Sequence, residues 1–110
     1  MSMDLIIDIV SKESGIDKEK LLSRDRTVIV SKARMILYKV LYMDNKSVIQ
    51  ISKKLDRNHA SVSVGITRVN NDANLWQEAV RIYNIYLLYD EEKEKKEQEK
   101  RYYICKLKAC

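Results

Sequence analysis

Hydrogen-bonding side chains crowd the stretch Arg57 to Ser61, which is the part of this chain best equipped to recognise a ligand. Apolar residues follow it at helical spacing and predict a helix with one buried side: Val62, Ile66 and Val69. In a helix-turn-helix, residues at the outward N-terminal end of the second helix face base edges in the major groove of DNA. The candidates for base contacts are therefore Asn58, His59, Ala60 and Ser61. His59 has a simpler alternative role as a helix cap.

Basic residues gather in two parts of the chain, over 24–34 and on either side of the predicted helix-turn-helix. Its 21 Lys and Arg residues exceed its 16 Asp and Glu residues, which gives a formal net charge of +5. A polyanion suits such a surface, because phosphates neutralised by Lys and Arg release their condensed counterions. An ordinary solvated surface is the alternative. The residues that we expect to contact phosphates or a DNA groove are Arg24, Arg26, Lys32, Arg34, Ser47, Arg57, Ser63 and Arg68.

Residues that could form a catalytic or metal site are scarce. His59 is the only histidine, no glycine-rich phosphate loop occurs, and no nucleophile has a base beside it in sequence. The only cysteines, Cys105 and Cys110, lie six residues or fewer from the end, where a disulfide would close only a small loop. We expect neither an enzyme nor a bound metal, cofactor or nucleotide.

Length and composition favour one small helical protein. The chain has 110 residues, no proline and two glycines, so helix breakers are nearly absent and long helices are expected. No apolar run approaches the roughly 18 to 20 residues that a membrane span needs. The N-terminus lacks the pattern of a secretory signal, so the cytoplasm is the expected location. The predicted fold class is all-α.

Four helices can be expected before Arg57. Apolar spacing from Leu5 to Val10 predicts the first, and Gly15 can end it. A short helix can follow Asp17. The stretch 23–30 is basic and then β-branched, which favours a loop, and Ser31 is a good cap for the third helix. Ser47 to Gln50 forms a capping box that predicts the fourth.

A helix-turn-helix follows from the short separation between two of these helices. Only Leu55 to Arg57 lies between the helix that begins at the capping box and the helix that follows Asn58. Two helices joined by so short a turn are typical of this motif.

The C-terminal third carries a long apolar helix. Residues Leu75 to Tyr89 are apolar on most sides, which indicates neighbours on most sides. One face can pack against the first helix, and a second protomer could cover another, which would form a homodimer. Opposite charges at helical spacing over 90–101 predict an exposed helical extension. The expected division is 1–73 for the helix-turn-helix domain and 74–110 for the long helix and charged tail.

Residues 15–69 resemble the C-terminal DNA-binding domain, domain IV, of the bacterial chromosomal replication initiator DnaA. The similarity includes Leu21-Leu22-Ser23 with the basic residues after it, and Ser47 to Ile51. The most specific part is Arg57-Asn58-His59-Ala60-Ser61-Val62, where the family has Arg-Asp-His-Thr/Ser-Thr-Val. The resemblance implies a helical bundle with a helix-turn-helix, similar to that of the trp repressor, that binds double-stranded DNA.

The resemblance also assigns roles to single positions. His59 matches the base-contacting histidine of the family, while Asn58 replaces its aspartate and Ala60 its first threonine. Aspartate accepts a hydrogen bond from the cytosine amino group, whereas asparagine suits adenine and alanine can contact only a thymine methyl. These replacements predict a different or relaxed target sequence.

Two functions remain open. One is a stand-alone DNA-binding protein, without ATPase activity, that regulates replication or transcription or competes with the initiator. The other is a protein-interaction module that uses the 75–89 helix and retains only vestigial DNA binding.

Overall fold

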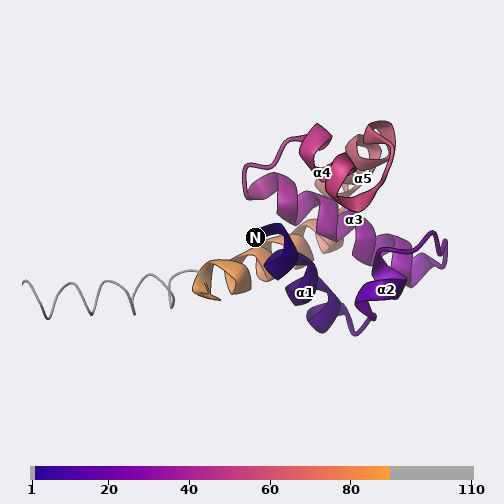
Figure 1. Cartoon of the computed structure of the whole chain (residues 1–110). Coiled ribbons are helices and arrows are strands. Elements are labelled where there is room, and N and C mark those ends of the chain that lie inside the picture. The colour runs from indigo at the N-terminus through magenta and orange to yellow at the C-terminus, as the bar shows by residue number, and fades with distance from the viewer. Residues whose placement is uncertain (1, 90–110) are drawn as a thin grey trace, which may run out of the picture.

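The computed structural model describes residues 2–89, and all regular structure in this range is helical. The elements are α1 (Ser2–Ser14), α2 (Lys18–Leu21), α3 (Val28–Met43), α4 (Val48–Leu55) and α5 (His59–Asn71). A further helix covers residues 73–89 (Figure 1). The all-α prediction is confirmed. Within the described residues, no helix is both long and apolar enough to cross a membrane.

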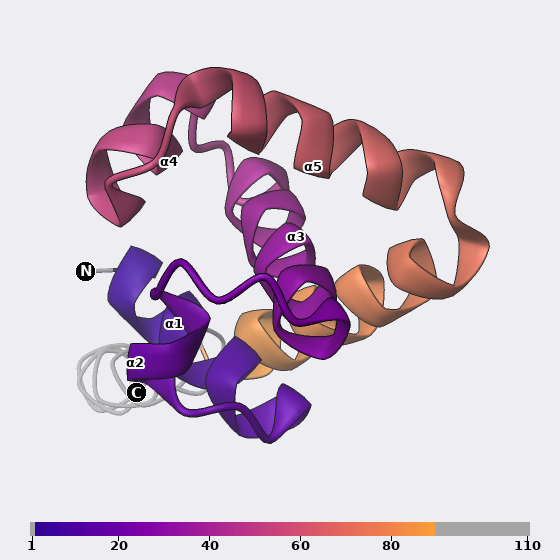
Figure 2. The same ribbon diagram turned by 90° about the vertical axis from the view of Figure 1, so that its right-hand side faces the viewer.

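Helix α3 lies at the centre of the fold. It contacts α1, α2, α4 and α5, and Figure 2 shows it between the α4–α5 pair and the layer formed by α1, α2 and the 73–89 helix. Leu37, Val40 and Leu41 on this helix have no exposed surface. Because every other labelled helix packs against α3, the position of the helix-turn-helix relative to the rest of the molecule depends on it.

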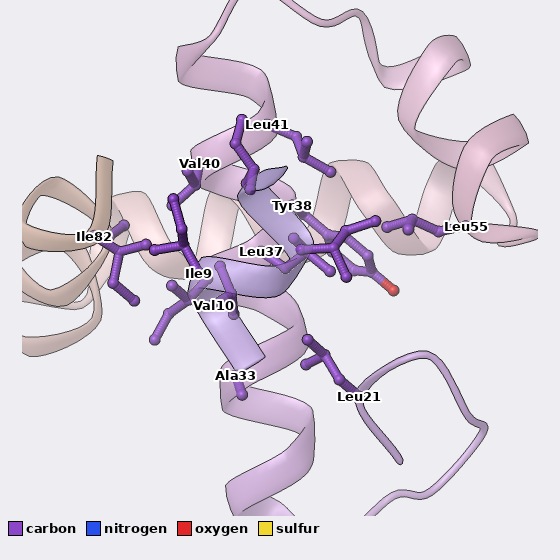
Figure 3. Packing of buried hydrophobic residues seen from close by; sticks show 14 of the residues in the cluster. Ile9, Val10, Leu21, Ala33, Leu37, Tyr38, Val40, Leu41, Leu55 and Ile82 are labelled. Carbon is purple, nitrogen blue, oxygen red and sulfur yellow. The ribbon is translucent and has the colours of Figure 1, made fainter. Parts of the chain in front are cut away.

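The 73–89 helix belongs to the same hydrophobic core. Ala79, Ile82 and Tyr86 are buried, and Figure 3 shows Ile82 among Ile9, Val10 and Val40. A salt bridge joins Arg81 Nη1 to Glu13 Oε1 of α1 at 2.7 Å. The predicted packing against the first helix is therefore confirmed. The predicted extension over 90–101 and the tail after it lie outside the described residues.

Helix α3 begins earlier than the sequence predicts. The expected loop is confirmed over 23–27 but not over 28–30, and the expected cap at Ser31 is wrong, because the helix starts at Val28 after the cap residue Thr27. The Ser31 amide donates to the Thr27 carbonyl at 2.8 Å within the first turn. β-branched residues cost a helix only a few tenths of a kcal/mol each, whereas burying Val30 to 3% exposure is worth about 1.5 to 3 kcal/mol.

The predicted capping box at the start of α4 is confirmed. The Ser47 hydroxyl accepts from the Gln50 amide at 3.1 Å, and the Gln50 side chain accepts from the Ser47 amide at 2.9 Å. At the other end of the helix, Asp56 takes the left-handed conformation with φ of 52°. The Arg57 amide then donates to the Ser52 carbonyl, which closes the helix. This geometry turns the chain sharply into α5.

Gly65 permits a close approach between α5 and α3. A β-carbon built at this position would lie 2.8 Å from Cδ2 of the Tyr38 ring and 3.3 Å from Cγ of Met35. Tyr38 is buried at 4% exposure and cannot swing into solvent. The absence of a side chain at position 65 thus sets the distance between the two helices.

Replacing Gly65 with alanine should lower the free energy of unfolding. Forcing a methyl group into a packed interior costs about 1 to 3 kcal/mol, which exceeds the gain of up to about 1 kcal/mol from the better helix propensity of alanine. Urea unfolding followed by circular dichroism measures the change. Val64→Ala, on the half-exposed adjacent position, is the control and should stay within about 0.5 kcal/mol of the parent. A G65A protein as stable as the parent would contradict the close packing.

Candidate nucleic-acid interface

The N-terminal end of α5 presents its polar side chains to solvent. Val62, Ile66 and Val69 are buried against the core, as predicted. All four residues predicted to contact bases are exposed at this end, and so is Ser63. The four are Asn58, His59, Ala60 and Ser61. The sequence therefore identified which side of the helix faces outward.

Asn58 is the cap of α5. Its Oδ1 atom accepts a hydrogen bond from the Ala60 amide at 2.8 Å, in the geometry expected of an N-cap residue. The capping role that sequence left open for His59 is thus filled by its neighbour, and His59 is the first residue of the helix. The first turn of α5 contains no acidic residue. The positive end of the helix dipole consequently favours an anion here.

A short loop, residues 22–27 and called the basic loop below, connects α2 to α3. The Asp25 Oδ1 atom accepts from the amide of Thr27 at 2.7 Å and from its hydroxyl at 2.5 Å. These hydrogen bonds from Thr27 lower the pKa of Asp25. The carboxylate is thus held by its own loop, while Arg24 and Arg26 on either side of it are exposed.

Arg34 does not face solvent, so its predicted phosphate contact is corrected. Only 8% of the residue is exposed. Its Nε donates to the Leu21 carbonyl at 3.0 Å, Nη1 to the Asp25 carbonyl at 3.0 Å and Nη2 to the Ser23 carbonyl at 2.6 Å. Burial, and then the nearby charge of Arg57, lower the pKa of Arg34. All three kinds of donor nitrogen are engaged by the backbone at the end of α2 and in the basic loop.

Arg57 also turns toward the basic loop. It is half-buried, and its Nη2 atom donates to the carbonyls of Leu22, at 3.3 Å, and Ser23. The sequence predicted a contact of this side chain with phosphate or a groove, and it did not predict this bond to a segment more than thirty residues away. The positive charge of Arg34 and Arg57 did not indicate which way either side chain points.

A polar pocket of about 270 Å³ lies between the basic loop, α3 and the start of α5. It brings together four exposed or half-buried residues that the sequence predicted as DNA contacts, which are Arg24, Arg26, Arg57 and Ser61, and a fifth that is buried. The buried Arg34 also lines it. Sequence reasoning missed Ser31, Met35 and Tyr38, which complete the wall. Their spacing of four and three residues along α3 is the signal that they share one face.

Other predicted residues lie elsewhere on the surface. Lys32 is exposed on a different face of α3, where it lines an apolar pocket beside Leu75 and Ile82. Ser47 is exposed at the start of α4. Arg68 is exposed on α5 and shares a shallow pocket with Ala60 and Ser61. Arg68 therefore extends the outward face of α5, whereas Lys32 is separated from the polar pocket.

Among the described residues, no group of three or more His, Cys, Asp or Glu side chains could hold a metal ion. The exposed groups of this surface can form hydrogen bonds and ion pairs with a ligand. Hydroxyl, amide and imidazole groups at the start of α5 can hydrogen-bond, and guanidinium groups beside them can pair with anions.

Comparisons with known proteins agree with this geometry. A family model described as the bacterial dnaA protein helix-turn-helix matches residues 3–69, which run from α1 to the buried Val69 of α5. No curated protein and no solved structure matches the chain significantly. The matched region covers more than half of the 110 residues and includes the helix-turn-helix formed by α4 and α5. The chain belongs to the bacterial DnaA helix-turn-helix family, a family of DNA-binding domains.

Proposed function

We propose that this protein binds double-stranded DNA by inserting the start of α5 into the major groove and contacting phosphates with the basic loop. The observation that carries the proposal is the polar pocket, where Arg24 and Arg26 of the basic loop meet Ser61 of α5. A duplex seated on α5 would bring its backbone to these arginines, because recognition helices lie with their N-terminal residues at base edges and flanking groups at phosphates.

His59 and Ser61 are the proposed base readers, and Asn58 has a restricted role. The Oδ1 atom of Asn58 already accepts from the Ala60 amide. Its NH₂ group remains suited to donate to a base acceptor, such as a purine N7 or the thymine O4. The aspartate that the family has here would instead accept from cytosine. Together with Ala60, this supports a target sequence that differs from that of the initiator or is less stringent.

Arg24, Arg26 and Arg68 are the proposed phosphate contacts. All three are exposed on the side of the molecule that carries α5 and the polar pocket. Ser47, Ser63 and Lys32 are exposed as well, but Lys32 lies on a different face of α3 and is separated from the polar pocket. The sequence contains no phosphate-binding Gly-x-x-x-x-Gly-Lys loop. We propose that the protein acts without ATPase activity, as a regulator of replication or transcription or as a competitor at initiator sites.

Binding to duplex DNA should be strongly dependent on salt. Fluorescence anisotropy with a duplex that contains the initiator's usual box, and with a scrambled duplex, measures affinity across a salt series. The logarithm of the association constant should fall with the logarithm of salt concentration by about 0.9 per phosphate contacted. Equal affinity for both duplexes would mean that specificity has changed while the DNA-binding surface persists. Absence of binding at low salt would exclude the proposal.

Loss of His59 should reduce sequence discrimination, whereas loss of Arg26 should reduce affinity for every duplex. A target is first obtained by selection from random duplexes. His59→Ala should then reduce discrimination between the target and a scrambled duplex by about 1 to 3 kcal/mol, because it removes a base contact. Arg26→Ala should weaken both duplexes alike and lower the salt slope by about 1. If H59A weakened both duplexes equally, His59 would not be a base reader.

A second candidate function uses the apolar surface of the 73–89 helix as a contact between two copies of the chain. Trp76 is 46% exposed and Leu88 is 60% exposed, although this helix also contributes to the core. Leu87 and Tyr89 beside Leu88 are exposed as well, and contiguous exposed apolar residues are typical of interaction surfaces. A homodimer would place two α5 helices on one particle, as in dimeric repressors that bind two half-sites.

Sedimentation velocity over a concentration series measures this association. A concentration-dependent dimer is expected, and Trp76→Ala should weaken it while the thermal unfolding midpoint stays close to that of the parent. Val64→Ala, which removes an exposed apolar side chain from α5, is the control and should leave association unchanged. A monomer at every concentration would exclude the homodimer, and loss of association in both variants would point to a surface other than the 73–89 helix.

A further inference from the structure

Two arginines from different elements bind the same short stretch of backbone. Arg34 belongs to α3, and Arg57 belongs to the turn just before α5. Both donate to the Ser23 carbonyl. Their remaining hydrogen bonds go to the carbonyls of Leu21, Leu22 and Asp25. Every acceptor thus lies between the last turn of α2 and the middle of the basic loop.

The chemistry of these acceptors requires donors at several fixed positions. The last carbonyls of a helix have no partner within the helix, and α2 ends at Leu21. A guanidinium presents five N–H groups in a rigid plane, so it can satisfy several carbonyls at once, whereas the flexible ammonium of lysine cannot hold this geometry. The cationic groups also suit the negative end of the helix.

The charge of this arrangement is not neutralised by an ion pair. Neither Arg34 nor Arg57 forms a salt bridge within residues 2–89. Both guanidinium groups donate to the Ser23 carbonyl, and burial and then the charge of Arg57 lower the pKa of Arg34. Like charges repel, so the arrangement leaves positive charge in the wall of the polar pocket. An approaching phosphate would be attracted to it.

We propose that Arg34 and Arg57 are positioning residues that fix the basic loop relative to α5, so that both parts engage the same segment of DNA. Arg57 precedes the start of α5 by two residues, so a bond from its side chain to the loop couples the two parts of the interface directly. Arg34 holds the same loop from α3. The inference rests on the proposed function, because it assumes that the basic loop and α5 bind DNA together.

Arg57→Lys is the most direct test, since it keeps the charge and removes the fork of donors. Helical content should be retained. Affinity for duplex DNA should fall roughly tenfold, within the range of coupling between residues of one network. The salt slope should decrease by about 0.9 for each phosphate contact that the displaced loop loses. Arg81→Lys, in a salt bridge remote from this surface, is the matched control and should leave affinity and slope unchanged.

A double-mutant cycle separates positioning from stability. In a background of Arg24→Ala and Arg26→Ala the loop has no arginine left to position, so R57K should then change affinity little. A full tenfold loss in that background would overturn the proposal. So would a lower unfolding temperature of R57K with affinity and salt slope unchanged, because the arginine would then serve stability alone. If R57K does not fold, Arg57→Gln, which keeps an amide donor, is measured against the same background.

Failure of the proposed function has a different signature. If the parent protein binds no duplex at low salt, the DNA-binding surface itself is excluded, and the positioning role falls with it. If the parent binds and R57K binds with the same affinity and slope, only the positioning role is excluded.

Discussion

The packing of α3 against its neighbours fixes the relative positions of all parts of the surface that we propose binds DNA. Leu37, Val40 and Leu41 on this helix are fully buried, and on its side toward α5 the ring of Tyr38 fits against the bare backbone of Gly65. The face that carries Tyr38 also carries Arg34, which holds the basic loop. A shift of α5 along α3 would therefore move the start of α5 and the basic loop relative to each other. Precision of the interface thus derives from a hydrophobic contact behind it.

The helix-turn-helix was predictable because its signals are local. A capping box needs only Ser47 and Gln50, and apolar spacing alone identifies the buried side of α5. The start of α3 was not predictable in this way. Val28 to Val30 have modest helix propensity, and the free energy that outweighs it comes from tertiary burial of Val30, which propensity does not include. The 73–89 helix is a similar case. Its apolar residues indicated that it is buried, but they did not identify every helix that packs against it.

The arginines show which property of a binding site the sequence does not predict, namely the direction in which a charged side chain points. Charge identifies a cation, but direction decides whether it meets a phosphate or a carbonyl. Arg34 lies four residues after Val30 and three before Leu37, so helical periodicity could have placed it on the buried face. No such signal exists for Arg57, since its partners are more than thirty residues away. For Arg24 and Arg26 the expected exposure agrees with the structure, and the carboxylate between them is hydrogen-bonded to Thr27 of the same loop.

The cap at Asn58 limits which side chains this position of the proposed DNA-binding surface can carry. The side chain at this position must accept a hydrogen bond from the first turn of α5, in addition to any contact that it makes with a base. Only Ser, Thr, Asp, Asn and, less well, Gly serve as good caps, and other residues sacrifice on the order of 1 kcal/mol of stability. Position 58 can therefore vary among only a few residue types, most of them small and polar. Long or cationic base readers, such as arginine for guanine, would have to arise on the neighbouring positions of α5, where no cap is needed.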